Sequence, residues 1–319
     1  MNRTTKRCYT APVSMALALT FALAACGGQQ GSAGEGSISG AVKIDGSSTV
    51  EPLSSAASEL YSAEQPEVQV TVGSSGTSGG FEAFCAGRTD ISDASRPIEP
   101  EEEQVCKKAG IEYSELQVAN DALTVVANKT VPVDCITTAQ LKKIWAPSAE
   151  GKITNWKQVD PSFPDTPLKL FGPGTDSGTF DYFTEKINGE EGVSRADYEG
   201  SEDDNVLVEG VANTPGSMGY FGYTYYEENT DKLKALEVDS GNGCVAPSAE
   251  TAQSGEYTPL ARPLFIYVNS KSYADKPQVA SYVDFYTQNL QKITEAAKYI
   301  QLNSRQEKAT QDALSSLGG

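Results

Sequence analysis

Short apolar runs alternate with amphipathic stretches from residue 40 onward, and this alternation predicts an α/β fold. Residues 42–44 and 68–72 carry alternating β-branched side chains and are expected to form strands. A helix is expected from Pro52 to about Ala63, because proline is tolerated at the start of a helix. Residues 277–317 are expected to be helical, with apolar side chains along one face.

One arrangement of strand, loop and helix occurs three times. Residues 46–49 follow the first strand, residues 73–80 follow the second, and residues 172–179 follow a strand expected at 168–171. Each loop is rich in Gly, Ser or Thr. Such a loop at a helix start offers backbone N–H groups and hydroxyls, and the helix dipole adds partial positive charge. One such loop is weak evidence, since Ser and Thr are ordinary N-caps, but three favour an anion site.

The second loop gives the main argument for an enzyme, because residues 76–80 match the GxSxG pattern of hydrolases. The sequence contains no histidine, so a Ser-His-Asp triad is impossible and a catalytic metal site is disfavoured. The chain also lacks the GxxxxGK[ST] motif of a nucleotide-binding loop. We expect no enzyme activity, no cofactor and no metal. A phosphoester hydrolase is the alternative from a different functional class.

The first 25 residues resemble a bacterial export signal. Arg3, Lys6 and Arg7 precede an apolar stretch that ends in Leu23-Ala24-Ala25-Cys26, which is similar to a lipobox. The stretch is about 15 residues long, shorter than the roughly 20 that a membrane-spanning helix needs. Residues 1–25 are therefore expected to be removed, Cys26 to carry lipid, and residues 26–39 to form a tether on the extracytoplasmic face of the bacterial membrane.

Two extended apolar segments, residues 116–128 and 260–268, are expected to cross between two domains. The chain that remains after the leader is long enough for two domains of ordinary size. We expect the chain to leave the first domain near Val118 and to return near Arg262. The expected domains are residues 40–118 plus 262–317, and residues 119–261.

Four cysteines remain when Cys8 and Cys26 are set aside, and an even number in an exported protein favours disulfides. Three pairings are possible. The domain division favours Cys85–Cys106 in one domain and Cys135–Cys244 in the other. A zinc site of four cysteines is disfavoured, because the spacings lack any CxxC pair.

The formal charge of the chain is −18, and loss of the three positive side chains of the leader makes it −21. Proteins that bind nucleic acid carry basic stripes, so this balance argues against such a partner. It does not exclude a small anion, because a buried anion responds to the few groups that touch it.

Arg96 stands alone at the end of a short expected strand, directly before Pro97. A surface salt bridge is the alternative interpretation of this residue. The apolar neighbours Ile91, Ala94 and Ile98 favour a partly buried position, and the planar guanidinium matches the oxygens of phosphate bidentately. We interpret Arg96 as a ligand to an anion.

Four segments together carry a family resemblance: "GSSTVEPL" (46–53), "VGSSGTSGGFEAFCAGRTDISDASRPI" (72–98), "FGPGTDSGTFDYF" (171–183) and "GSMGYFGYTYY" (216–226). The chain resembles the extracytoplasmic phosphate-binding protein of the Pst-type ABC uptake system. The resemblance implies a periplasmic-binding-protein fold with two α/β domains on a hinge and inorganic phosphate in the cleft. It further implies a monomer that delivers phosphate to a membrane permease. A binding protein for sulfate or another oxyanion is the alternative within this class.

The resemblance also implies which residues hold the ion. The phosphate-binding residues carried over from the family are Ser48, Thr49, Val50, Ser75, Thr77, Ser177, Gly178 and Thr179. Many members have an aspartate where this chain has Arg96, and an arginine just before the third loop. The third loop of this chain begins Pro173-Gly174-Thr175-Asp176 and has no arginine. We interpret the charged pair as exchanged between loops, with Arg96 as the positive ligand and Asp176 as the carboxylate that selects phosphate.

Overall fold

The structure is a computed structural model that describes residues 38–175 and 177–317. The described residues belong to one compact unit. The predicted leader, the predicted lipidation site Cys26 and the predicted ligand Asp176 lie outside the described residues. Within the described ranges, no helix is both long and apolar enough to cross a membrane.

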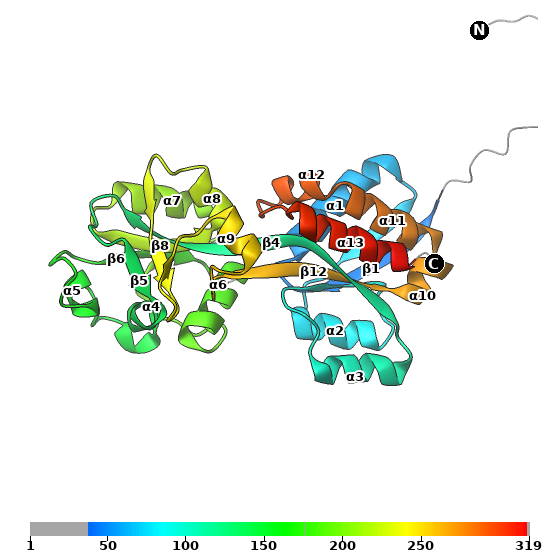
Figure 1. The fold of residues 1–319 in the computed structure, drawn as a ribbon, viewed down its shortest axis with the longest axis horizontal. Helices are drawn as coiled ribbons and strands as arrows, with labels where there is room; N and C mark the ends of the chain where they lie inside the picture. Colours follow the sequence, from blue (N-terminus) through cyan, green and yellow to red (C-terminus); the bar gives the residue numbers. More distant parts are fainter. Residues whose placement is uncertain (1–37, 176, 318–319) are drawn as a thin grey trace, which may run out of the picture. The chain divides into compact units, whose positions relative to one another are not determined.

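A mixed sheet runs through this unit in the order β2-β1-β3-β12-β4-β8-β6-β7, with β9 also paired to β4 (Figure 1). Its strands are β1 (Gly40–Gly46), β2 (Val68–Val72), β3 (Ile91–Ala94), β4 (Tyr113–Asn128), β6 (Lys169–Pro173), β7 (Glu199–Ser201), β8 (Ser217–Gly222), β9 (Leu233–Ala235) and β12 (Ala261–Asn269). A small second sheet has the order β11-β10-β5. Its strands are β5 (Cys135–Thr137), β10 (Glu237–Asp239) and β11 (Cys244–Val245).

The first lobe, as we name it, is built on the parallel strands β1, β2 and β3. Helices cover both faces of this part of the sheet (Figure 1). They are α1 (Glu51–Glu64), α2 (Thr77–Cys85), α3 (Pro100–Ala109), α10 (Ser270–Asp275), α11 (Pro277–Gln288), α12 (Leu290–Ala296) and α13 (Ser304–Leu317). One face buries the aliphatic residues of β1 against α1 and α11, and the other buries Phe81 and Phe84 of α2.

The second lobe is built on β6, β7 and β8 with the small sheet beside them. Its helices are α4 (Thr138–Trp145), α5 (Trp156–Val159), α6 (Gly178–Phe183), α7 (Asp204–Asn213), α8 (Tyr223–Glu227) and α9 (Ala249–Ser254). A 3-10 turn covers Pro147–Ala149, and a π-helical turn, Thr184–Asn188, extends α6. Its largest core contains a group of aromatic rings: the ring of Trp145 packs edge-on against Tyr220, which stacks on Phe183.

Two long antiparallel strands, β4 and β12, join the lobes (Figure 1). The first part of β4 pairs with β12, and its second part pairs with β8 and β9 of the second lobe. These are the segments that the sequence predicts to be extended. The pairing sets Arg262 opposite Asp121 and Pro263 opposite Asn120.

The predicted α/β elements are present, with two corrections. Helix α2 begins at Thr77, inside the predicted second loop of residues 73–80, so part of this loop is already helical. Residues 277–317 form three helices rather than one continuous helical stretch. The interruption at residues 298–303 has a physical reason, because the backbone of Ile300 forms a β-bridge with Asn120 of β4.

Both predicted disulfides are confirmed. Cys85 bonds to Cys106, with Cα atoms 4.3 Å apart, and this bond joins α2 to α3. Cys135 bonds to Cys244, with Cα atoms 6.0 Å apart, and closes the small sheet of the second lobe. The four-cysteine zinc site is therefore ruled out, because all four sulfurs are used in pairs.

Candidate functional site

The three predicted loops meet at a cleft of about 960 Å³ between the lobes. Strands β1 and β2 of the first lobe and β6 of the second each end beside this cleft, which brings their loops together. The predicted site residues that line the cleft are Ser48, Thr49, Ser75, Thr77, Arg96 and Gly178. Thr179 lines a neighbouring pocket with Pro52 and Asp121. Most of the predicted residues that the structure describes are therefore gathered at one place.

The first and third loops come into close contact across the cleft. A Cβ atom built on Gly178 of α6 would lie 3.0 Å from Thr49 Oγ1 and 3.2 Å from Ser48 Oγ. The glycine at this position therefore allows the third loop to approach the hydroxyls of the first. The hydroxyls of the first lobe and the start of α6 in the second lobe therefore face the same small space.

Several hydroxyl oxygens at the site accept hydrogen bonds from the backbone. Thr49 N–H donates to Ser47 Oγ at 3.2 Å, and Thr179 N–H donates to Ser177 Oγ at 3.2 Å. A hydroxyl has one hydrogen to donate, so an oxygen that accepts from the backbone keeps its own O–H for another partner. This arrangement presents O–H donors, which suits an anionic ligand.

The second loop is fixed to the first by Asp45 at the end of β1. Asp45 Oδ1 accepts hydrogen bonds from Gly46 N–H at 2.9 Å and from Ser75 N–H at 3.1 Å. Gly76 N–H also donates to Gly46 O at 2.8 Å. Asp45 therefore positions Ser75 at the cleft. Val50 differs from the expectation, because its backbone N–H donates to Ser47 O at 3.0 Å and closes the turn before α1.

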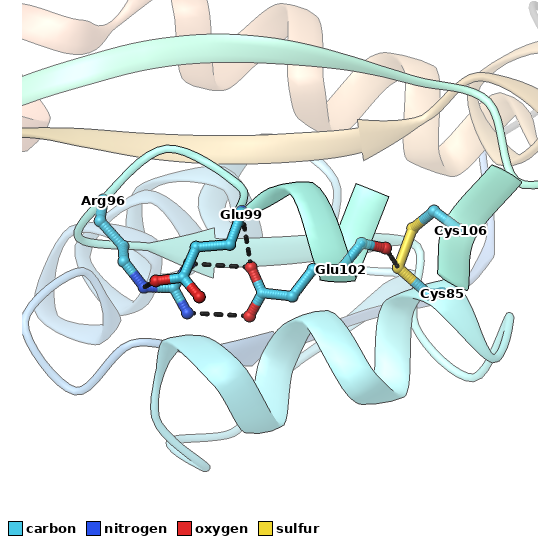
Figure 2. The surroundings of a disulfide bond; sticks show 5 residues. All are labelled: Cys85, Arg96, Glu99, Glu102 and Cys106. Atoms are coloured by element: carbon cyan, nitrogen blue, oxygen red, sulfur yellow. Dashed lines mark hydrogen bonds and ion pairs between the residues drawn. A yellow bond between two sulfur atoms is a disulfide. The ribbon is translucent and has the colours of Figure 1, made fainter. Parts of the chain in front are cut away.

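Arg96 lies in the cleft, but its guanidinium is bound to the chain itself. Figure 2 shows the side chain directed at Glu99 and Glu102. The Nη1 and Nη2 atoms each donate to one oxygen of Glu102 at 2.8 Å, and Nη2 also donates to Ser78 Oγ at 2.9 Å. The hydrogen bond to Glu102 is the main reason that the pKa of Arg96 is raised. The Cys85–Cys106 disulfide lies next to this group, since Cys85 Sγ contacts Glu102 O at 3.6 Å (Figure 2).

Arg262 is a second arginine at the cleft. The sequence predicts only that it lies in a segment that crosses between the two domains. Its Nε donates to Asp121 Oδ2 at 3.1 Å, and its Nη2 donates to Thr49 Oγ1 at 2.8 Å. Its guanidinium carbon lies 3.6 Å from the centre of the Tyr182 ring. A lone arginine within an apolar crossing segment is the signal that could have pointed to it.

Asp93 in β3 is buried beneath the site rather than exposed to it. Its Oδ1 accepts a hydrogen bond from Ser54 Oγ at 2.9 Å, and its Oδ2 has no hydrogen-bond partner among the described residues. Burial raises the pKa of Asp93 to about 8, with Ser54 opposing the shift and the charges of Glu51 and Asp45 adding to it. The carboxyl group is therefore protonated at neutral pH.

Comparison with known proteins agrees with this architecture. A family model described as a PBP superfamily domain matches residues 31–289. The phosphate-binding protein PstS of Staphylococcus saprophyticus is 38% identical over 306 residues, which cover 95% of this chain and 93% of that protein. Protein SphX of Synechococcus elongatus is 52% identical over 265 residues, which cover 83% of this chain and 78% of that protein.

A solved structure is also similar. The crystal structure of a possible phosphate binding protein from Planctomyces limnophilus has 46% sequence identity and a TM-score of 0.84, and the match covers 88% of this chain and 99% of that one. The two-lobed α/β fold with its cleft is that of a solute-binding protein. The chain belongs to the PBP superfamily and, within it, to the family of the PstS phosphate-binding proteins. The resemblance and fold class inferred from the sequence are confirmed.

Proposed function

We propose that the chain binds one inorganic phosphate ion in the cleft and delivers it to the permease of an ABC transporter, without chemical turnover. The observation that carries this proposal is the meeting of the first and third loops, because the hydroxyls of Ser48 and Thr49 lie beside Gly178 at the start of α6. The printed names of the relatives, which describe phosphate binding, support the choice of ligand. Sulfate remains the alternative ligand, and a phosphoester hydrolase the alternative class.

The proposed donors are the hydroxyls of Ser48, Thr49, Ser75, Thr77, Ser177 and Thr179, with the backbone N–H of Gly178. Asp176 is proposed as the carboxylate of the site, on the sequence argument given above, and one of the two arginines at the cleft, Arg96 or Arg262, as its positive member. A site closed around the anion replaces its hydration shell with fixed donors. Micromolar affinity corresponds to about −8 kcal/mol, and an array of such hydrogen bonds can supply it after the costs of association.

We also propose that the lobes move about a hinge in β4 and β12. These two strands join the lobes, and they lie beside the cleft at Asp121 and Arg262. The proposed domains are residues 40–118 plus 262–317, and residues 119–261. A strand pair can bend or twist near such a crossing while each core stays packed.

The proposed location is the extracytoplasmic face of the membrane, where the protein acts as a monomer held by lipid on Cys26. The lipobox-like segment before Cys26 supports this location. Membrane fractionation of a Cys26→Ala variant tests the anchor. A variant that stays in the membrane fraction would contradict it.

Calorimetric titration of the purified protein with phosphate and with sulfate tests the function. We expect one site that binds phosphate more tightly than sulfate. A parallel assay with a chromogenic phosphoester separates binding from hydrolysis. Sustained turnover by the pure protein would overturn the proposal in favour of the hydrolase.

A further inference from the structure

The two arginines at the cleft differ in how many of their N–H groups are already used. A guanidinium has five N–H donors. In Arg96, Nη1 and Nη2 bind Glu102, Pro97 O and Ser78, and Nε lies 3.4 Å from Glu99 Oε1. The chain's own acceptors therefore engage all the nitrogens of Arg96.

Arg262 makes fewer such bonds. Among the hydrogen bonds of residues 38–175 and 177–317, its Nε binds Asp121 and its Nη2 binds Thr49, while Nη1 makes none. Its side chain is also better buried, with 11% of its surface exposed against 29% for Arg96. A charged donor in a less hydrated place makes a stronger hydrogen bond to an anion.

The position of Arg262 is fixed by three elements. Asp121 of β4 holds Nε, and Thr49 of the loop before α1 accepts from Nη2. Tyr182 of α6 lies under the guanidinium and is itself fixed, because its hydroxyl donates to Pro259 O at 2.6 Å. The guanidinium thus touches both lobes at the strand pair that joins them, and little rotamer freedom remains to be lost when a ligand binds.

The hydrogen bond to Thr49 also sets the direction of a hydroxyl that the proposed function uses. Thr49 Oγ1 accepts from the charged Nη2, so its own hydrogen must point to another acceptor. An oxyanion beside Thr49 can accept this O–H and an N–H of Arg262 together. The carboxylates of Asp121 and Asp181 are the negative groups near the guanidinium, and both compete with the anion for its charge.

We propose that Arg262 supplies the positive charge that contacts the bound phosphate, in place of the sequence-based assignment to Arg96. This inference rests on the proposed function. Arg96 then serves to hold the end of β3 against the start of α3 through Glu102. Asp121 is a positioning residue, which orients Arg262 without touching the ligand.

Calorimetric titration with inorganic phosphate tests the assignment in the full mature protein. We expect Arg262→Gln to lower the affinity on the order of 10- to 100-fold, because a charge-assisted hydrogen bond is lost. The loss of phosphate affinity in Arg96→Gln should be at least tenfold smaller than the loss in Arg262→Gln. The control is Arg305→Gln, an exposed arginine of α13 whose loss should leave binding unchanged. Thermal unfolding of each variant shows that it is folded.

The variant Asp121→Asn tests whether Arg262 contacts the phosphate or only forms a structural ion pair with Asp121. The amide keeps an acceptor for Nε but removes a competing negative charge, so affinity for phosphate should equal or exceed that of the parent. A loss as large as that of Arg262→Gln would overturn the proposal, and so would a larger loss in Arg96→Gln than in Arg262→Gln. A parent protein that binds no phosphate would instead refute the proposed function itself.

Discussion

The side chain of Asp93 shows how one residue can tie stability to pH. Its neighbours are Ser54 and Glu51 of α1, Asp45 of β1, and Tyr282 and Tyr286 of α11. None of these is a cation, so the neutral carboxyl is the stable form inside the fold. In the unfolded chain the same carboxyl has an ordinary pKa near 3.9.

Asp93→Asn should therefore change the pH dependence of stability. With a folded-state pKa of about 8, the Asp93 carboxyl stabilises the fold fully below about pH 4 and loses this contribution as the pH rises to about 8. The loss is at most about 1.4 kcal/mol per pH unit. Asparagine does not titrate, so the free energy of unfolding of the variant should rise relative to that of the parent between pH 5 and pH 8. Urea unfolding of both proteins at pH 5 and at pH 8 measures this change. An equal difference in unfolding free energy at the two pH values would contradict the prediction.

Asp176 is predicted to select phosphate over sulfate. Phosphate carries P–OH donors near neutral pH and sulfate carries none, so a fixed carboxylate binds the first and repels the second. Asp176→Asn should weaken phosphate binding and reduce the difference in affinity between phosphate and sulfate, as measured by titration with each anion. If the variant still rejects sulfate as strongly as the parent, the selecting acceptor lies elsewhere. Asp181, which lines the cleft, would then be the next residue to test.

At the scale of elements, the repeated unit of strand, loop and helix was predictable from the sequence. Alternating apolar residues, Gly/Ser/Thr loops and a proline at a helix start are local signals, and they located β1, α1, β2 and β6 within a few residues. The disulfide pairing followed from the order of the predicted domains. The elements depend on neighbours in the chain, whereas the Cys135–Cys244 bond, which spans 109 positions, was predictable only through the domain order.

The partners of the two arginines were not predictable in the same way. Arg96 binds Glu102, which also forms the capping box of α3 with Glu99, and a glutamate at the N-cap is not part of the usual Ser/Thr-x-x-Glu pattern. Arg262 meets Asp121 across a strand pair and Thr49 from more than 200 positions away. Such contacts depend on the register of β4 with β12, and no local pattern specifies that register.

Gly178 at the start of α6 should be required for the two loops to meet. In Gly178→Ala, the added methyl would lie 3.0 Å from Thr49 Oγ1 and 3.2 Å from Ser48 Oγ, so these hydroxyls must shift by a few tenths of an ångström. We expect phosphate binding to weaken, because the shifted hydroxyls no longer meet the ion in their present positions; overpacking of this kind costs about 1–3 kcal/mol in a packed core. Calorimetric titration measures this loss. Gly200→Ala is the matched control, because a methyl there lies 3.5 Å from Tyr198, and an equal loss in both variants would contradict the steric argument.

At the scale of the whole described unit, few polar contacts join the lobes beyond β4 and β12. Among the described residues, Gln253 of α9 donates to Gln301 O at 2.9 Å and its backbone oxygen accepts from Gln306 Nε2 at 3.4 Å, and an ion pair joins Lys298 of the first lobe to Glu228 of α8. Tyr299 donates to Thr49 O at 2.7 Å, so the segment after α12 also supports the first loop. Because these contacts are few, they can break and form again while the core of each lobe stays packed. This suits lobes that open and close around a ligand.

Phosphate should therefore slow amide hydrogen exchange on both sides of the cleft at once. An ion held by both lobes favours the closed arrangement and protects the loops at residues 47–50 and 177–179, whose amides otherwise exchange when the lobes separate. The measurement is exchange followed by mass spectrometry, with and without saturating phosphate. Peptides from the buried core around Trp145 serve as the internal control, since their protection already reflects a packed core. Protection confined to residues 47–50 would mean that one lobe alone holds the ion, and the hinge proposed in β4 and β12 would then have no role in binding.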